Sequence, residues 1–173
     1  MREIWDIYWN KIDAINIETV IKNDSYYRLL KRLIDLPNRK HLRILEVGCG
    51  SGIRTLALLK ELQNYQVRAT FVDFSAAALA FARKNANKSG IKATFVLANA
   101  LQLPFHDNSF DIVWNEGVNE HFQGEMRQVI FNEMARVTKP GGQVVVIVPN
   151  ALNLPYRLWK KVLENRRKWE FGF

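Results

Sequence analysis

The stretch Leu45-Glu46-Val47-Gly48-Cys49-Gly50-Ser51-Gly52 determines the predicted fold, because a short aliphatic run passes there into closely spaced glycines. Ile53, Leu56 and Ala57 follow at helical spacing, so the sequence predicts a strand, a tight turn and a helix in that order. Glycines let the backbone turn sharply and let a ligand approach the main chain, and the start of a helix presents free N–H groups.

Four further aliphatic runs alternate with helical patterns, one of which begins after Ser75 as N-cap and stops at Gly90. This alternation implies right-handed crossovers and a sheet covered on both faces. We therefore predict a doubly wound, Rossmann-like α/β fold with a mostly parallel sheet of strand order 3-2-1-4-5. The expected strands are 43–48, 69–73, 93–98, 110–114 and 143–148. A helical stripe expected to face the core consists of Met126, Val129, Ile130, Met134 and Val137.

The residues before the first strand predict an amino-terminal helical cap. Apolar residues there recur three or four positions apart, which predicts two amphipathic helices. A cap over the carboxyl ends of the strands would exclude water from a ligand crevice, and packing on the flank of the sheet is the alternative. The expected organisation is a cap (1–40), an α/β core (41–150) and an amphipathic basic helix (151–173). The apolar residues of the cap are Trp5, Tyr8, Trp9, Ile12, Tyr26, Leu29, Leu30 and Leu33.

Composition limits the class of protein. The 173 residues are 48% hydrophobic and 24% charged, as in a soluble domain with a proper core. The single cysteine, Cys49, has no partner in the chain and no zinc-ligand spacing surrounds it, so we expect a cytoplasmic protein without a metal. The longest aliphatic stretch, 144–148, is far shorter than the roughly 20 residues that span a bilayer. The net charge of +8 favours a polyanionic partner, and half of this excess lies in residues 157–170.

Asp73 ends the second expected strand, within Phe71-Val72-Asp73-Phe74-Ser75. In the expected strand order its carboxylate lies beside the glycine turn, where it can accept two hydrogen bonds from a ribose diol. An acid that stabilises a helix N-terminus is the alternative. Ile53 stands where a dinucleotide-binding motif has its third glycine. The turn is also not followed by the Lys-Ser/Thr pair with which a nucleoside-triphosphate loop holds phosphate and magnesium. The sequence thus indicates an adenosine-containing ligand other than a nicotinamide dinucleotide or a nucleoside triphosphate.

Four motifs together resemble the class I S-adenosylmethionine-dependent methyltransferases, most closely the small-molecule branch called type 11. They are Glu46-Val-Gly-Cys-Gly-Ser-Gly52, Asp73, Leu103-Pro-Phe-His-Asp-Asn-Ser-Phe-Asp-Ile-Val113 and Arg136-Val-Thr-Lys-Pro-Gly-Gly142. The resemblance covers about residues 40–150 in the order of the family. It implies S-adenosylmethionine as cofactor and S-adenosylhomocysteine as product.

The resemblance also implies which residues hold the methionine part of this cofactor. Gly48, Cys49 and Gly50 would pack against it, and Glu46 would lie near its amino group. Asn115, at the end of the fourth strand, would line the floor near the sulfonium.

The nucleoside part would contact four other residues. Asp73 would hold the ribose hydroxyls and Phe74 would lie against the adenine ring, while Asn99 and Ala100 would read the adenine edge. Relatives often carry aspartate at the position of Asn99, and asparagine still offers a carbonyl acceptor for the adenine amino group.

Methyl transfer from a sulfonium has an excellent leaving group, so the enzyme chiefly supplies alignment and desolvation. A general base would add about 10²- to 10⁴-fold for an acceptor that must lose a proton. His121 and Glu116, just past the fourth strand, are the candidates. A structural hydrogen bond is the alternative for His121, and a capping or solvated role is the alternative for Glu116. Cys49 has no histidine partner in the sequence and is interpreted as a small filler.

The leading function is methyl transfer to a small-molecule acceptor. An RNA methyltransferase, a non-catalytic module that binds cofactor or protein, and contact of the basic helix with a membrane surface are the alternatives. The family normally continues with antiparallel strands after the fifth strand, whereas this sequence ends at Phe173. We expect either a piece of a longer enzyme or a five-stranded sheet, with an uncovered edge that favours a homodimer.

Overall fold

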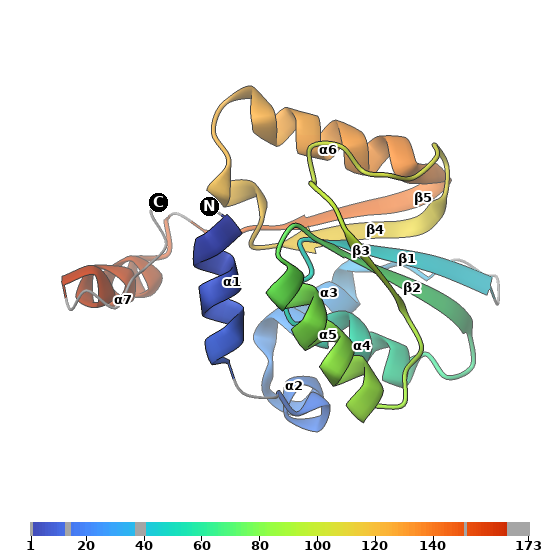
Figure 1. Cartoon of the computed structure of the whole chain (residues 1–173), viewed down its shortest axis with the longest axis horizontal. Coiled ribbons are helices and arrows are strands. Elements are labelled where there is room, and N and C mark those ends of the chain that lie inside the picture. The colour runs from blue at the N-terminus through green and yellow to red at the C-terminus, as the bar shows by residue number, and fades with distance from the viewer. Residues whose placement is uncertain (1, 13–14, 37–40, 151, 166–173) are drawn as a thin grey trace.

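A computed structural model describes residues 2–12, 15–36, 41–150 and 152–165. Three helices precede the first strand, and from there strands and helices alternate except between the third and fourth strands, which a loop joins directly (Figure 1). The elements are α1 (Arg2–Lys11), α2 (Ile17–Asn23), α3 (Ser25–Leu33), β1 (His41–Val47), α4 (Ile53–Glu61), β2 (Gln66–Asp73), α5 (Ala76–Lys88), β3 (Thr94–Leu97), β4 (Phe110–Glu116), the 3₁₀ turn η1 (Asn119–His121), α6 (Glu125–Val137), β5 (Thr138–Ile147) and α7 (Leu154–Asn165).

The sheet has five strands in the order β3-β2-β1-β4-β5, and every neighbouring pair is parallel. This confirms the predicted fold class and strand order. The chain leaves β1 in one direction for β2 and β3 and then returns to the other side of β1 for β4 and β5. The order therefore reverses at the carboxyl ends of β1 and β4, which is where ligands bind in open α/β sheets.

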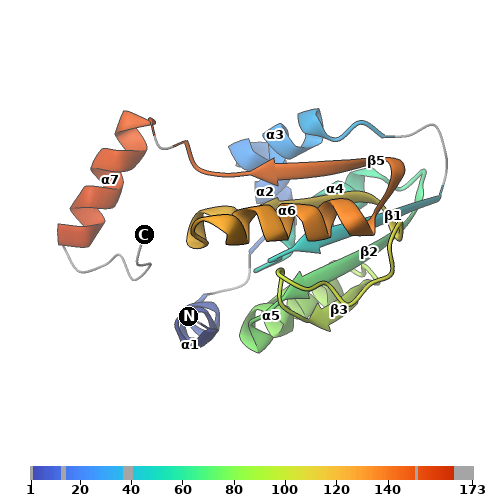
Figure 2. The same ribbon diagram turned by 90° about the horizontal axis from the view of Figure 1, so that it is seen from above.

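Alternate residues of the strands build a core on each face of the sheet. Helices α2 to α5 cover one face, where Ile44, Phe71 and Trp114 are fully buried. Helix α6 covers the other face together with the loop that joins β3 to β4 (Figure 2). This loop, residues 98–109, contains no helix and inserts Leu103 into the second core.

Several boundaries differ from the sequence prediction. Three helices rather than two precede the sheet, because Asn16 and Asp24 cap separate helices through their side chains. Strand β5 begins at Thr138 rather than at Gln143, since its first residues already pair with β4 through an irregular register near Phe110. Ser75 caps α5 as predicted, by accepting a hydrogen bond from the backbone N–H of Ala78.

The prediction that the whole apolar stripe of α6 faces the core is wrong for two residues. Ile130, Met134 and Val137 are buried, whereas Met126 and Val129 are 45% and 41% exposed. Both exposed residues lie in the first turns of α6, at the carboxyl end of the sheet (Figure 1). Helix α6 therefore contacts the sheet mainly through its second half.

The carboxy-terminal region lies beyond the edge strand. In the described residues β5 pairs only with β4, and the homodimer expected from this edge stays a prediction. Helix α7 lies apart from the sheet in both ribbon views (Figures 1 and 2). Part of the predicted basic segment, residues 166–173, lies outside the described residues. Within the described ranges, the helices are too short or too polar to cross a bilayer.

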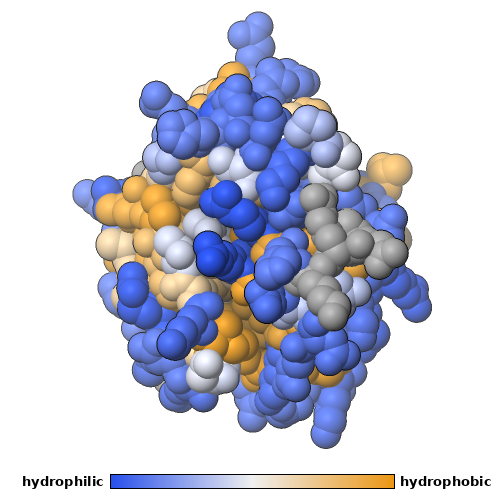
Figure 3. Space-filling view, turned by 90° about the vertical axis from the view of Figure 1, so that its right-hand side faces the viewer, coloured by the Kyte–Doolittle hydropathy of each residue, from blue (hydrophilic) through white to orange (hydrophobic). Residues whose placement is uncertain are grey.

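The two ends of the sheet have different surroundings. Helix α1 lies beside the carboxyl ends of the strands (Figure 1). The opposite end, seen in Figure 3, presents mainly hydrophilic residues with hydrophobic areas between them. A site at the carboxyl end of the sheet thus has helix α1 as a cover.

Candidate functional site at the carboxyl end of the sheet

The glycine turn between β1 and α4 is held against the end of β2. The backbone N–H groups of Gly48 and Cys49 donate to the carbonyl oxygen of Val72 at 2.8 and 2.9 Å. Gly50 has a φ of 50° and donates its N–H to Asp73 Oδ2 at 2.9 Å. A Cβ at position 50 would lie 2.5 Å from the indole ring of Trp9. Both the backbone conformation and this close approach therefore require glycine at position 50.

Asp73 connects the turn to the start of α5. Its side chain is buried, and Oδ1 accepts the N–H of Ser75 at 2.9 Å while Oδ2 accepts that of Gly50. Burial raises the pKa of Asp73, and these backbone donors oppose the rise. A carboxylate has about four lone-pair sites, so both oxygens retain acceptor capacity for further donors. The geometry combines the predicted place beside the glycine turn with the alternative role at the start of a helix, since Oδ1 accepts the N–H of the α5 N-cap residue Ser75.

A cavity of about 500 Å³ opens between the glycine turn, Asp73 and helix α1. Its wall includes all the predicted cofactor-binding residues except Asn115, and both predicted catalytic residues. The predicted residues on this wall are Glu46, Gly48, Cys49, Gly50, Asp73, Phe74, Asn99, Ala100, Glu116 and His121.

Glu46 is the buried carboxyl group of this cavity. Only 6% of the residue is exposed, and its Oε2 atom has no hydrogen-bond partner among the described residues. Burial raises the pKa of Glu46 to about 8, opposed by a hydrogen bond with the Thr55 side chain. Thr55 in turn accepts the indole N–H of Trp114 at 2.9 Å. An unpaired acceptor on the wall of a cavity suits a ligand that carries a cationic donor, such as an ammonium group.

Phe74, Asn99 and Ala100 form the side of the cavity beyond Asp73. The N–H of Ala98 donates to the carbonyl oxygen of Asp73 at 3.0 Å and so ties the start of the 98–109 loop to β2. Asn99 Oδ1 accepts the N–H of Leu101 at 3.0 Å. The Asn99 side-chain oxygen, which the resemblance assigns to the adenine edge, thus stabilises a local turn.

The opposite side of the cavity carries ionisable groups that follow β4. Glu116 forms an ion pair with Arg54 Nη1 at 3.1 Å, and Arg54 Nη2 lies 2.9 Å from Asp24 Oδ2. Burial raises the pKa of Glu116 to about 7 despite this arginine. Burial lowers the pKa of His121, opposed by a hydrogen bond with the backbone of Gly117. The imidazole is therefore neutral at pH 7 and suited to accept a proton.

Aromatic residues of α1 form the remaining wall. Trp5, Tyr8 and Trp9 line the cavity, and the Trp5 ring meets the His121 ring edge to face at 5.0 Å. Asp6 holds the helix in place, because its carboxylate accepts hydrogen bonds from the Ser75 hydroxyl and the Ala77 N–H. The structure thus brings the amino-terminal helix and the candidate acceptor-side histidine together.

Asn115 and Cys49 differ from the other predicted residues. Asn115 is fully buried and does not line the cavity, and its amide donates to Asn119 Oδ1 at 2.7 Å. This contact positions the start of η1. Cys49 lies on the wall, and burial raises the pKa of its thiol well above the usual value, which disfavours the thiolate form that a nucleophile needs.

Sequence reasoning missed three groups of this site. Trp5 was assigned only to a helix face, and Arg54 and Glu120 were not singled out, yet all three line the cavity. Arg54 follows the glycine turn by two residues, and Glu120 directly precedes His121. The sequence offered two signals: Arg54 lies on the first helical turn after the glycine turn, and Glu120 lies next to a candidate base.

The fold and cavity define a doubly wound α/β protein with a ligand-sized cavity at the carboxyl ends of its strands, and comparisons identify its family. Residues 44–142 match the model of the family described as methyltransferase domain. The chain is 34% identical over 147 residues to the demethylmenaquinone methyltransferase of Staphylococcus aureus (strain MRSA252), which covers 84% of this chain and 58% of that protein. This chain belongs to the methyltransferase-domain family, within the class I S-adenosylmethionine-dependent methyltransferases.

Solved structures agree on the fold. The PH0226 protein from Pyrococcus horikoshii OT3 has a TM-score of 0.69 and 24% identity, and the match covers 92% of this chain and 72% of that one. The cyclase SpnF has a TM-score of 0.60 and 27% identity over 70% of this chain and 43% of its own. The chain spans about half the length of the curated relatives that it matches.

Proposed function

We propose that this chain binds S-adenosylmethionine in the cavity at the carboxyl end of the sheet and transfers its methyl group to a small-molecule acceptor. One observation carries the proposal: the glycine turn, Asp73 at the end of β2, the buried carboxyl group of Glu46 and the neutral imidazole of His121 all line the same cavity. The curated relative is named for a quinone acceptor, which supports a small molecule as the acceptor class.

The residues present fit this cofactor. Its ammonium group would pair with Glu46, whose Oε2 has no partner among the described residues, and its ribose hydroxyls would donate to Asp73. Phe74, Asn99 and Ala100 would surround the base, as the resemblance to the family implies. When bound, the cofactor supplies a methyl group on a positively charged sulfur.

The chain's own residues supply alignment and exclusion of water. The glycine turn is fixed by hydrogen bonds to Val72 and Asp73, so it needs no rearrangement to receive a ligand. Trp5, Tyr8 and Trp9 cover the cavity with aromatic faces, which favour a neighbouring cation and exclude water. Positioning of this kind accounts for effective molarities of about 10⁵ M or more.

Where the methyl acceptor must lose a proton, His121 takes up that proton. Its neutral imidazole lies in the same cavity as Glu116 and is oriented by the Gly117 backbone and the edge of Trp5. Glu116 is paired with Arg54 and is therefore the weaker candidate for this step. The imidazole releases the proton to solvent after the methyl group has been transferred.

The proposal is tested by adding labelled S-adenosylmethionine and the purified chain to a cell extract and searching the extract for labelled small molecules. The chain with Asp73→Ala serves as the matched control. We expect the unmodified chain to label a low-molecular-mass product, and we expect this label to be absent when the Asp73→Ala chain is used. Label in RNA or protein alone, or equal labelling by the control, would contradict the proposed acceptor or the proposed site.

A further inference from the structure

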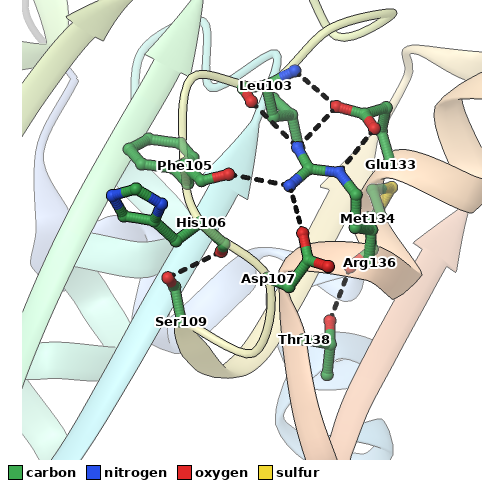
Figure 4. Close-up of polar contacts among 9 residues, drawn as sticks. All are labelled: Leu103, Phe105, His106, Asp107, Ser109, Glu133, Met134, Arg136 and Thr138. Carbon is green, nitrogen blue, oxygen red and sulfur yellow. Dashed lines mark hydrogen bonds and ion pairs between the residues drawn. The ribbon is translucent and has the colours of Figure 1, made fainter.

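Arg136 belongs to a motif, Arg136-Val-Thr-Lys-Pro-Gly-Gly142, to which the methyl-transfer site assigns no role. Its guanidinium group lies outside the cavity, between helix α6 and the 98–109 loop (Figure 4). All five of its N–H donors are used, because Nε and each of Nη1 and Nη2 bond to the loop or to the helix. The pKa of Arg136 is raised by its acidic partners, so the group stays charged.

The contacts of Arg136 combine two backbone carbonyls with two carboxylates. Its Nη2 donates to the carbonyl oxygen of Leu103 at 3.0 Å and its Nη1 to that of Phe105 at 2.8 Å. Glu133, one turn earlier on α6, takes two further bonds at 2.7 and 2.8 Å and also accepts the N–H of Leu103 at 2.7 Å. Asp107 takes the fifth bond at 2.8 Å and is largely exposed.

The loop held in this way is the one that carries Asn99 and Ala100 into the cavity. It has no helix or strand of its own, so its position depends on what anchors it. One anchor is the bond from the Ala98 N–H to the Asp73 carbonyl at 3.0 Å. The next is the group of bonds around Leu103. Only four residues separate these anchors, and they form a turn closed by the bond from the Gln102 N–H to the Asn99 carbonyl at 3.0 Å.

We infer that Arg136 is a positioning residue for cofactor binding: by clamping the 98–109 loop to α6, it places Asn99 and Ala100 where they meet the base of the nucleoside. The inference rests on the proposed position of the base in the cavity. Lysine cannot replace this arginine, because a single ammonium group lacks the planar fork that reaches both carbonyls and Glu133 together.

Arg127 provides a matched comparison on the same helix. Its Nε donates to the carbonyl oxygen of Phe122 at 2.6 Å and so holds the loop on the opposite side of the cavity. Helix α6 thus anchors both loops that border the cavity, each through one arginine. Changing Arg127 to lysine alters the same helix and the same residue type but leaves the nucleoside side intact.

The test measures ligand affinity and loop protection in Arg136→Lys, with Arg127→Lys and Asp35→Ala, which changes an exposed acid outside the clamp and the cavity, as controls. Calorimetry uses S-adenosylhomocysteine and 5′-methylthioadenosine, which share the base and ribose but differ in the amino-acid part. We expect the Kd of both ligands to rise about tenfold in Arg136→Lys and to change less than twofold in the controls. Amide hydrogen exchange at residues 99–105 is expected to accelerate in Arg136→Lys, while exchange in β1 and β4 stays as in the unmodified chain.

Glu133→Gln tests the same clamp if Arg136→Lys fails to fold, and we expect a three- to fivefold rise in both Kd values. Unchanged affinity in the folded variants, a loss confined to S-adenosylhomocysteine, or unchanged exchange in the loop would each overturn the inference. Failure of the unmodified chain to bind either ligand would instead contradict the proposed cofactor site.

Discussion

Replacing Asp73 by alanine should weaken cofactor binding more than any other single truncation in the cavity. The change removes the carboxylate proposed to accept the ribose hydroxyls and also leaves the N–H groups of Gly50 and Ser75 without their acceptor. A hydrogen bond to a charged group contributes about 1.5–3 kcal/mol. Since 1.4 kcal/mol corresponds to a factor of ten, the Kd of S-adenosylhomocysteine should rise by roughly 10- to 150-fold.

Calorimetric titration measures this loss, and a ligand analogue separates the ribose contact from loosening of the glycine turn. The analogue lacks the 2′-hydroxyl of S-adenosylhomocysteine. It should bind the unmodified chain more weakly than the parent compound does, yet the two should bind Asp73→Ala with similar affinity, because their common partner is gone. Asp35→Ala, which removes an exposed acid outside the cavity and outside the clamp, is the control and should bind like the unmodified chain.

Two results would refute this reasoning. An Asp73→Ala chain that is folded by circular dichroism and binds the parent ligand with unchanged Kd would remove Asp73 from the ribose site. A 2′-hydroxyl effect of the same size in both chains would show that another group holds the ribose.

Three further predictions follow from the cavity and the sheet edge. Burial raises the pKa of Glu46 to about 8, so this carboxyl is mostly protonated at pH 7, and a bound ligand ammonium should cause it to ionise. The proton released should make the binding enthalpy vary with the ionisation enthalpy of the buffer, and the affinity should rise from pH 6 to 8. Glu46→Gln should abolish both effects. For an acceptor that loses a proton, His121→Gln should lower kcat about 10²- to 10⁴-fold and change the Kd of the cofactor less than twofold. The variant should also lose the fall in rate that the unmodified chain shows below the lowered pKa of His121. A variant that reacts as fast as the unmodified chain would exclude His121 as the base. Light scattering at increasing concentration should show a homodimer formed through β5, and a particle that stays monomeric would contradict this use of the edge.

The sequence predicts the sheet well because strands buried on both faces read as continuous aliphatic runs. All five strands follow from such runs, and their order was taken as that of the doubly wound fold that alternating strands and helices predict. The start of β5 was missed, because Pro140-Gly141-Gly142 has the composition of a turn, although Thr138 before it already pairs with Phe110 of β4 and the ladder resumes at Gln143 after a register shift. Local composition could not reveal this, since the pairing depends on a partner strand far away in the sequence.

The candidate site divides in the same way. The positions of Gly50 and Asp73 follow from one turn and one strand end, and the structure joins them by a hydrogen bond of 2.9 Å. The approach of Trp5 to His121 joins residues more than a hundred positions apart, and no spacing in the sequence signals it. The same holds for the clamp between Arg136 and the 98–109 loop, which requires α6 to be placed on the sheet first.

A crystal structure of the chain with S-adenosylhomocysteine would show where the nucleoside lies. We predict its ribose hydroxyls within hydrogen-bond distance of the Asp73 carboxylate and its amino group beside Glu46. A ligand bound elsewhere, or an empty cavity in crystals grown at a ligand concentration that saturates the chain in solution, would contradict the proposed site.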